Sequence, residues 1–274
     1  MTTTIEPMPT ERPRERRQRV QAAETGMAVL KGLADLGGRA TLTALSAHVG
    51  EPSSKVHRYL VSLGEEGLVS QDAATQQYFL GPEAIRIGMA AMRQADPIRA
   101  AEPALVRLRE ALEVTCFVAV MGNKGPTIVR FEEPGLPVTV NVRVGSVLSL
   151  LWSATGRAFL GYLDERAVHA MAKEELASAL PEQRGLLDAK RPIDSLREAV
   201  RAAGCACVRD VYLRGISAVA APIRDHTGRV CAVLTALGAT GGFDALETGP
   251  IAAAVRREAA AISATLGCTE PARG

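Results

Sequence analysis

Residues 53–66 carry side chains that could recognise DNA. In a helix of about 100° per residue, the apolar side chains of Val56, Tyr59, Leu60 and Leu63 share one side. The other side carries Ser54, Lys55, His57, Arg58, Val61 and Ser62. Short polar and basic side chains of this kind reach base edges and phosphates in the major groove. The segment therefore predicts a recognition helix, and the open alternative is an ordinary amphipathic surface helix. The residues expected to contact DNA are Ser53, Ser54, Lys55, His57 and Arg58.

Patterns that would indicate catalysis or metal binding are incomplete elsewhere in the chain. Residues 215–219 read Gly-Ile-Ser-Ala-Val and lack the last glycine of a nucleophile elbow. Residues 122–125 are too short to form a phosphate-binding loop. The histidines His48, His57, His169 and His226 show no paired metal-ligand spacing. We therefore expect no enzyme activity, no metal and no cofactor.

The segments around residues 53–66 must present this helix to a partner. A first helix is expected because Met27, Leu30, Leu33, Ala34 and Leu36 recur at helical spacing, and the glycine pair that follows should stop it. Thr41 is an N-capping residue type that opens a second short helix, which Gly50 ends. After the third helix, two strand-like runs flank a turn at residues 72–75. Three helices and a hairpin within residues 21–81 predict a winged helix-turn-helix.

The rest of the chain predicts a second domain of a different kind. Residues 82–96 carry Ile85, Met89 and Met92 at helical spacing and are expected to form a linker helix. From residue 97 to 268, helical segments alternate with strand-like runs, and the tight turn at residues 225–228 implies an antiparallel hairpin. The strands are expected at residues 115–121, 127–132, 138–142, 205–209, 216–223 and 230–237. We expect an α+β domain with helices flanking a mainly antiparallel sheet.

Composition and charge limit the classes of partner. The chain has 274 residues, of which 47% are hydrophobic, and a net charge of +2. Residues 1–20 are expected to form a disordered arm with five arginines. Residues 1–95 hold only eleven Lys and Arg against ten Asp and Glu. Attraction to phosphate must therefore come from local clusters, and we expect a homodimer or a tetramer to strengthen binding.

The cysteines and the apolar stretches indicate the compartment. Five cysteines are scattered along the chain without a CxxC pair, which favours reduced thiols in a cytoplasmic protein over a disulfide framework or a structural zinc site. The densest apolar stretches fall short of the roughly 18 residues that a membrane-spanning helix needs. We expect no membrane association.

One segment carries a specific family resemblance: residues 51–60 read Glu-Pro-Ser-Ser-Lys-Val-His-Arg-Tyr-Leu. With this segment as its strongest local match, the sequence resembles the IclR family of bacterial transcriptional regulators. Residues 78–81, 153–157, 215–222 and 228–230 also fit blocks of the family. The resemblance implies a winged helix-turn-helix, a linker helix and a GAF-like effector-binding domain, assembled as dimers or dimers of dimers without catalytic activity. Family members often carry a basic residue directly after the turn proline, where this chain has Ser53.

The resemblance also places a pocket for an organic acid in the second domain. The matching positions are Ala154, Thr155, Val208, Ala218, Thr235 and Leu237. An acidic side chain that is typical near Val208 is missing, so we expect an aromatic or longer-chain carboxylic acid. The alternative is that these residues are simply core. Ser153 would cap a helix whose free N–H groups, on Ala154, Thr155 and Gly156, make a carboxylate site.

Together these features predict a regulator that binds a near-palindromic DNA operator and responds to a small organic acid. The low net charge of the first 95 residues keeps a second hypothesis open. In that hypothesis the chain is a ligand-sensing or interaction module whose DNA-binding domain is degenerate.

Overall fold

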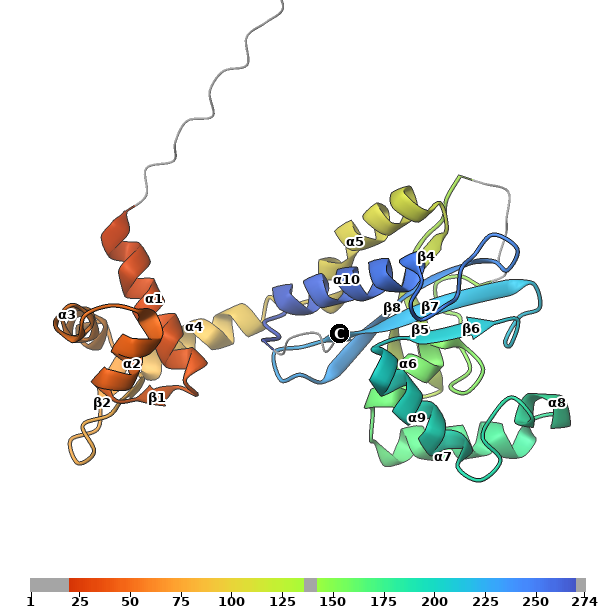
Figure 1. The fold of residues 1–274 in the computed structure, drawn as a ribbon, viewed down its shortest axis with the longest axis horizontal. Helices are drawn as coiled ribbons and strands as arrows, with labels where there is room; N and C mark the ends of the chain where they lie inside the picture. Colours follow the sequence, from red (N-terminus) through yellow and green to blue (C-terminus); the bar gives the residue numbers. More distant parts are fainter. Residues whose placement is uncertain (1–19, 136–141, 270–274) are drawn as a thin grey trace, which may run out of the picture. The chain divides into compact units, whose positions relative to one another are not determined.

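The computed structural model describes residues 20–135 and 142–269. Its internal contacts divide the chain into two units, residues 1–94 and 95–274 (Figure 1). The arm expected at residues 1–20 lies almost entirely outside the described residues. No helix in the described ranges is long and apolar enough to cross a membrane.

The first unit is a winged helix-turn-helix. Its elements are α1 (Gln21–Asp35), β1 (Arg39–Ala40), α2 (Leu42–Val49), α3 (Ser53–Glu65), β2 (Val69–Gln71), β3 (Tyr78–Leu80) and α4 (Pro82–Met92). The strands form an antiparallel sheet in the order β1-β3-β2. The Thr41 side chain caps α2, and Gly50 ends that helix with a left-handed backbone that favours glycine. These two residues set the tight turn that leads into α3.

The buried face of α1 depends partly on glycine. Met27 is 47% exposed, whereas Val29 and Leu33 are fully buried. Gly26 and Gly32 lie on the buried face because other elements approach them closely: a Cβ on Gly32 would lie 2.7 Å from Val49 Cγ2 of α2. The spacing of apolar residues predicted this helix, but it gave no sign of a packing face that depends on glycine.

Helix α4 buries none of its residues. It begins with Pro82 at its first turn, where a missing N–H costs nothing. Ile85, Ile87, Met89 and Met92 are each at least half exposed. Spacing alone therefore identified the helix but did not indicate what its apolar side chains contact.

The second unit is an α+β domain. Its helices are α5 (Pro97–Leu112), α6 (Ala154–Tyr162), α7 (Arg166–Ser178), α8 (Pro181–Arg184), α9 (Pro192–Ala203) and α10 (Pro250–Thr265). Its strands are β4 (Thr115–Gly122), β5 (Gly125–Glu132), β6 (Ala206–Arg209), β7 (Ile216–Arg224) and β8 (Val230–Ala239). They form one antiparallel sheet in the order β5-β4-β8-β7-β6. Most of the strand expected at residues 138–142 lies outside the described residues.

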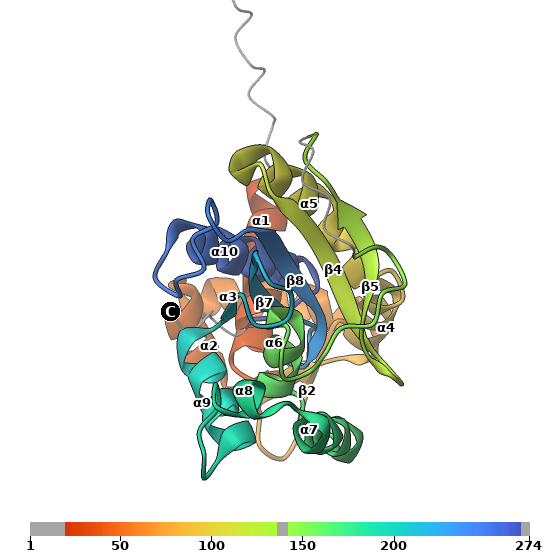
Figure 2. The same cartoon turned by 90° about the vertical axis from the view of Figure 1, so that its right-hand side faces the viewer.

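Two hydrophobic cores lie on opposite faces of this sheet. Helices α5 and α10 cover one face, and α6 with α9 covers the other (Figures 1 and 2). Leu105, Leu234 and Val255 belong to the first core, and Phe117, Phe159 and Val233 belong to the second. Because successive strand residues point to opposite faces, β4 and β8 contribute to both cores. The face covered by α6 holds the pocket described below.

Candidate nucleic-acid face and ligand pocket

Helix α3 presents the predicted polar side chains on its outer face. Ser53, Ser54, His57 and Arg58 are exposed, while Val56, Leu60 and Leu63 are buried. Pro52 is the N-cap and makes no side-chain cap bond, so Ser53 is the first helical residue and not a cap.

The three ionisable side chains of this face have different environments. Lys55 Nζ lies 2.8 Å from Glu51 Oε1, so the carboxylate of Glu51 partly neutralises the charge of Lys55. His57 Nδ1 lies 3.1 Å from the Tyr78 hydroxyl, a hydrogen bond that ties α3 to β3. The Arg58 guanidinium has no hydrogen-bond or ion-pair partner within the described part of the chain. Arg58 is therefore the cation of α3 that is free to bind an anion.

Two further features of the first unit were not among the predicted contacts. Arg39 of β1 stacks over the Phe79 ring and lies 3.4 Å from Asp72 in the β2–β3 turn, which places a half-exposed cation at the wing. Val61 is 49% exposed on the otherwise polar face of α3. Spacing had placed Val61 on that face, but an isolated exposed valine carries no signal of function by itself.

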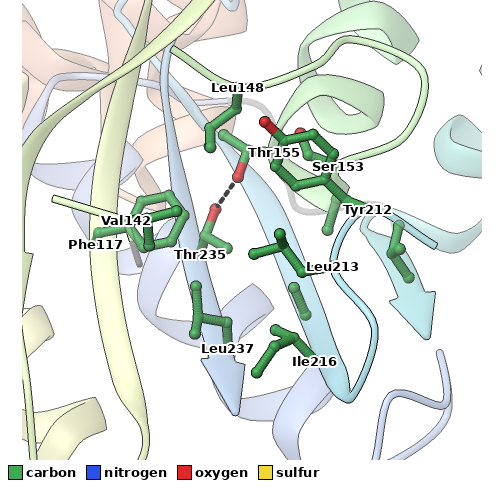
Figure 3. Close-up of a pocket in the computed structure, with 13 residues that line it drawn as sticks. Phe117, Val142, Leu148, Ser153, Thr155, Tyr212, Leu213, Ile216, Thr235 and Leu237 are labelled. Carbon is green, nitrogen blue, oxygen red and sulfur yellow. Dashed lines mark hydrogen bonds between the residues drawn. The ribbon is translucent and has the colours of Figure 1, made fainter. Parts of the chain in front are cut away.

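A pocket of about 410 Å³, including the space open to solvent, lies between α6 and the sheet. It is lined by Phe117, Val142, Leu148, Ser153, Ala154, Thr155, Val208, Tyr212, Leu213, Ile216, Ala218, Thr235 and Leu237 (Figure 3). Six of the seven predicted ligand-binding residues are in this set, and Gly156 is not. None of the lining side chains is charged.

Strand register brings these distant residues together. Val208 of β6 pairs with Ala218 of β7, and Ala218 pairs in turn with Leu237 of β8. Thr235, two residues before Leu237, pairs with Phe117 of β4. Cross-strand partners share one face of a sheet, so these five side chains form a continuous wall opposite α6.

The N-terminus of α6 supplies the polar end of the pocket. Ser153 Oγ accepts a hydrogen bond from Gly156 N at 2.9 Å, which leaves the N–H groups of Ala154 and Thr155 without a partner among the described residues. The expectation that Gly156 N–H is free was therefore wrong. A Cβ on Gly156 would lie 2.0 Å from Ser149 O, so this glycine allows α6 to approach its own preceding loop, not a ligand.

Glu175 of α7 holds that loop. Its carboxylate accepts hydrogen bonds from Ser149 Oγ, Leu150 N and Leu151 N at 2.6, 2.8 and 3.0 Å. These bonds fix the chain immediately before Ser153 and so orient the first turn of α6. No pattern in the sequence connects a glutamate in one helix with backbone amides about 25 residues earlier.

Two buried hydroxyls and one tyrosine complete the polar groups. Thr155 Oγ1 and Thr235 Oγ1 are 2.9 Å apart, and both residues are 1% exposed (Figure 3). Tyr212 lines the same pocket as Ser153 and Thr155 (Figure 3). Burial, together with the charge of Glu175, raises the pKa of the Tyr212 hydroxyl, which stays protonated and can donate at neutral pH. Tyr212 and Leu213 come from the β6–β7 loop, which sequence patterns did not assign to the site.

A winged helix-turn-helix joined to an α+β domain with an uncharged ligand pocket defines a DNA-binding regulator of the ligand-responsive class. Comparison with known families agrees. Residues 22–73 match the IclR helix-turn-helix domain, and residues 89–264 match the C-terminal domain of the bacterial transcriptional regulator IclR. The chain belongs to the IclR family of DNA-binding transcriptional regulators, which carry a C-terminal effector-binding domain.

Individual relatives agree with this assignment. The chain is 27% identical to the HTH-type transcriptional regulator BhcR of Paracoccus denitrificans, over 81% of this chain and 78% of BhcR. The crystal structure of Pseudomonas aeruginosa HmgR is 42% identical, with a TM-score of 0.82 over 92% of this chain and all of HmgR. An IclR homolog from Microbacterium hydrocarbonoxydans, crystallised in complex with 4-hydroxybenzoate, is 20% identical and shares the fold, with a TM-score of 0.52 over 89% of this chain and 98% of that one. BhcR is by name a transcriptional regulator, as is the family whose domains match this chain.

Proposed function

We propose that this regulator binds an operator through α3 and that a small aromatic carboxylic acid in the pocket modulates this binding. The observation that carries the proposal is an apolar pocket with two free main-chain N–H groups at one end and no charged lining residue. We assign DNA binding to residues 21–81, the linker to residues 82–96 and effector binding to residues 97–268.

The carboxylate would bind at the N-terminus of α6. The N–H groups of Ala154 and Thr155 and the positive end of the helix dipole together favour an anion without Lys or Arg. The Thr155–Thr235 pair has two hydroxyl hydrogens and uses one of them between the two oxygens. The second hydrogen is available to the ligand. Tyr212, which lines the same pocket, adds a further donor.

The apolar part of the ligand would contact the wall formed by the sheet. Phe117, Ile216 and Leu237 offer aromatic and aliphatic contacts, whereas Val208 and Ala218 lack polar atoms in their side chains. An aromatic ring fits this lining better than a short polar acid, whose remaining oxygens would lose hydrogen bonds to water. The complex of the Microbacterium hydrocarbonoxydans homolog with 4-hydroxybenzoate supports an acid of this class.

Binding of DNA would involve two copies of the chain. The outer face of α3 carries one unpaired guanidinium, Arg58, and one lysine that is already paired. Such a face offers few phosphate contacts, so one copy would bind weakly. A dimer or a dimer of dimers that reads two half-sites of a near-palindrome would add the contacts of both copies.

Ligand binding can be tested with 4-hydroxybenzoate as the probe. We expect it to change the fluorescence of Trp152, which lies next to Ser153 and is the only tryptophan. At 100 times its dissociation constant it should stabilise the protein by about 2.7 kcal/mol. 4-Hydroxybenzyl alcohol keeps the ring without the carboxylate, and acetate keeps the carboxylate without the ring. If the alcohol binds as tightly as the acid, the proposed carboxylate site is wrong.

DNA binding can be tested by electrophoretic shift with the intergenic DNA upstream of the neighbouring operon. We expect a shift at low salt that weakens steeply as salt is added. Absence of a shift at low salt, with ligand binding intact, would favour the second hypothesis of a ligand-sensing module with a degenerate DNA-binding domain.

A further inference from the structure

A pair of cysteines lies on the sheet face opposite the pocket. Cys205 directly precedes β6, and Cys207 is its second residue. Both side chains pack toward the α5–α10 core, where Cys205 is fully buried and Cys207 is partly exposed. Ala206 and Val208 of the same strand face the other way, and Val208 lines the pocket. The two thiols are therefore attached to the back of a pocket wall.

Arg256 of α10 lies against the first of these thiols. Its Nη1 is 3.3 Å from Cys205 Sγ, 3.1 Å from Ala203 O and 2.9 Å from Glu247 O. One nitrogen with two hydrogens thus serves three acceptors, and the guanidinium charge lies next to the sulfur. A cation beside a thiol favours the thiolate.

The pKa values of four cysteine thiols differ because their surroundings differ. A hydrogen bond from the Cys207 thiol, opposed by burial and helped by the charge of Arg256, lowers the pKa of Cys205. Donating that hydrogen bond raises the pKa of Cys207. Burial raises the pKa of Cys116 to about 12 and that of Cys231 to about 11. Cys205 is the thiol in this group that is favoured to ionise.

We propose that Cys205 and Cys207 form a modification site for hydroperoxides, at which a reversible disulfide closes behind the pocket wall. The Cys205 thiolate attacks one peroxide oxygen, the O–O bond breaks, and the leaving oxygen takes a proton to become water or an alcohol. Cys205 is then a sulfenic acid. The Cys207 sulfur attacks the Cys205 sulfur, the S–O bond breaks, and water leaves with the Cys207 proton. The two thiols have together given two electrons to the peroxide.

The position of the pair favours a disulfide that is easily reduced. Two residues of a strand are about 6.6 Å apart between Cα atoms, near the upper end of the range that disulfides span. Cys205 lies outside the β6–β7 register and follows Gly204, whose left-handed backbone ends α9, so the chain can adjust there. A strained disulfide has a more oxidising potential and is the labile, regulatory kind. A bound cation is disfavoured because Arg256 already lies against Cys205, and the described residues contain no cluster of three or more metal-ligating side chains.

The full-length protein permits a direct test. Trypsin releases residues 202–209, a peptide that carries both cysteines and no other. After treatment with a slight excess of hydrogen peroxide and alkylation under denaturing conditions, we expect this peptide to lose two hydrogens and to take up no alkyl group. Dithiothreitol or reduced glutathione should restore double alkylation. Cys116 and Cys231 in the same sample should remain fully alkylated, which provides an internal control.

Matched variants separate the two steps. In Cys207→Ser the disulfide should be lost completely, and dimedone should trap the sulfenic acid on Cys205. In Cys205→Ser, Cys207 should stay alkylatable. Arg256→Gln should slow oxidation toward the rate of a free cysteine, and Arg256→Lys should restore part of the rate. Full alkylation of both cysteines in the folded wild-type protein after peroxide would overturn the proposal, as would disulfide-linked dimers on a non-reducing gel in place of the internal bond.

Discussion

The candidate site of the first unit is local in sequence and exposed, whereas that of the second unit is buried and built from distant parts of the chain. The side chains of α3 that we propose to contact DNA lie within six residues of one another and are mostly exposed. The pocket is lined by one helix and four strands, and its two threonine hydroxyls come from residues 80 positions apart that are almost fully buried. A substitution on α3 should therefore change binding without changing stability. A substitution in the pocket should change both, because the same atoms hold the domain together.

The largest expected effect is that of Thr155→Asp. The new carboxylate would face the ligand carboxylate at about 4 Å, which costs about 4 kcal/mol at an effective dielectric constant of 20. Titration of Trp152 fluorescence should show that the affinity for 4-hydroxybenzoate falls by about a thousandfold. Binding of the ligand-free protein to DNA should survive.

Because Thr155 is buried, Thr155→Asp also lowers stability, so a milder variant is needed. Thr155→Val keeps the shape and the main-chain N–H but removes the hydroxyl. This variant should bind 4-hydroxybenzoate with about tenfold lower affinity. Parent-like affinity in both variants would place the ligand elsewhere.

The next effect contrasts two glycines. In Gly156→Ala the added Cβ meets Ser149 O at 2.0 Å and Leu150 Cα at 2.5 Å, both of them backbone atoms. Urea unfolding should show a loss of about 3 kcal/mol. Gly88→Ala in α4 meets no atom within 4 Å, so it should gain up to about 1 kcal/mol from helix propensity. Equal effects of the two substitutions would contradict the close packing of α6 on its loop.

A smaller effect is expected for Arg58→Ala on the exposed face. Loss of one phosphate contact should weaken DNA binding and lower the salt slope by about one for each copy bound. The free energy of unfolding should change by less than about 0.5 kcal/mol. Arg86→Ala removes the same charge from α4 and should leave the slope closer to the parent value. A folded Lys55→Ala, Arg58→Ala double variant that binds DNA like the parent would rule out α3 as the recognition helix.

The smallest effect concerns Val61, the exposed apolar side chain on the same helix face. A valine there can contact the methyl group of thymine. On a selected operator, replacing one thymine by uracil should cost the parent about fourfold in affinity, roughly the value of one buried methyl group. Val61→Ala should bind the thymine and uracil operators equally well. Ser62→Ala should still bind the thymine operator more tightly, as the parent does. If no thymine-to-uracil change affects the parent, Val61 makes no such contact.

Local patterns predicted the fold well because its elements carry their own signals. Thr41, Gly50 and the turn at residues 72–75 mark the limits of short elements, and the apolar stripe of α3 faces the core as expected. The close packing of α1 at Gly26 and Gly32 was not predictable in this way, because an apolar pattern gives no weight to a residue without a side chain.

The pocket was predictable only where resemblance supplied its positions. Periodicity indicates which side of a strand is buried, but it does not indicate which strands are neighbours. The pairing of Phe117 with Thr235 is a long-range choice that depends on strand order. Tyr212 lies in a loop without periodicity, and Glu175 acts through backbone amides that every residue possesses. Contacts of this kind become visible only in the folded chain.

The free N–H groups at the start of α6 have a consequence for how the pocket can diverge. They belong to the main chain, so no exchange of side chain except to proline removes them. The proposed requirement for an acid is thereby separated from the choice of acid, which would depend on the apolar lining. Randomising Phe117, Leu148 and Ile216 should yield variants that respond to different rings and chains, all of them carboxylates. Mutation of side chains should therefore leave the proposed carboxylate site in place, while it changes which ring or chain the pocket accepts.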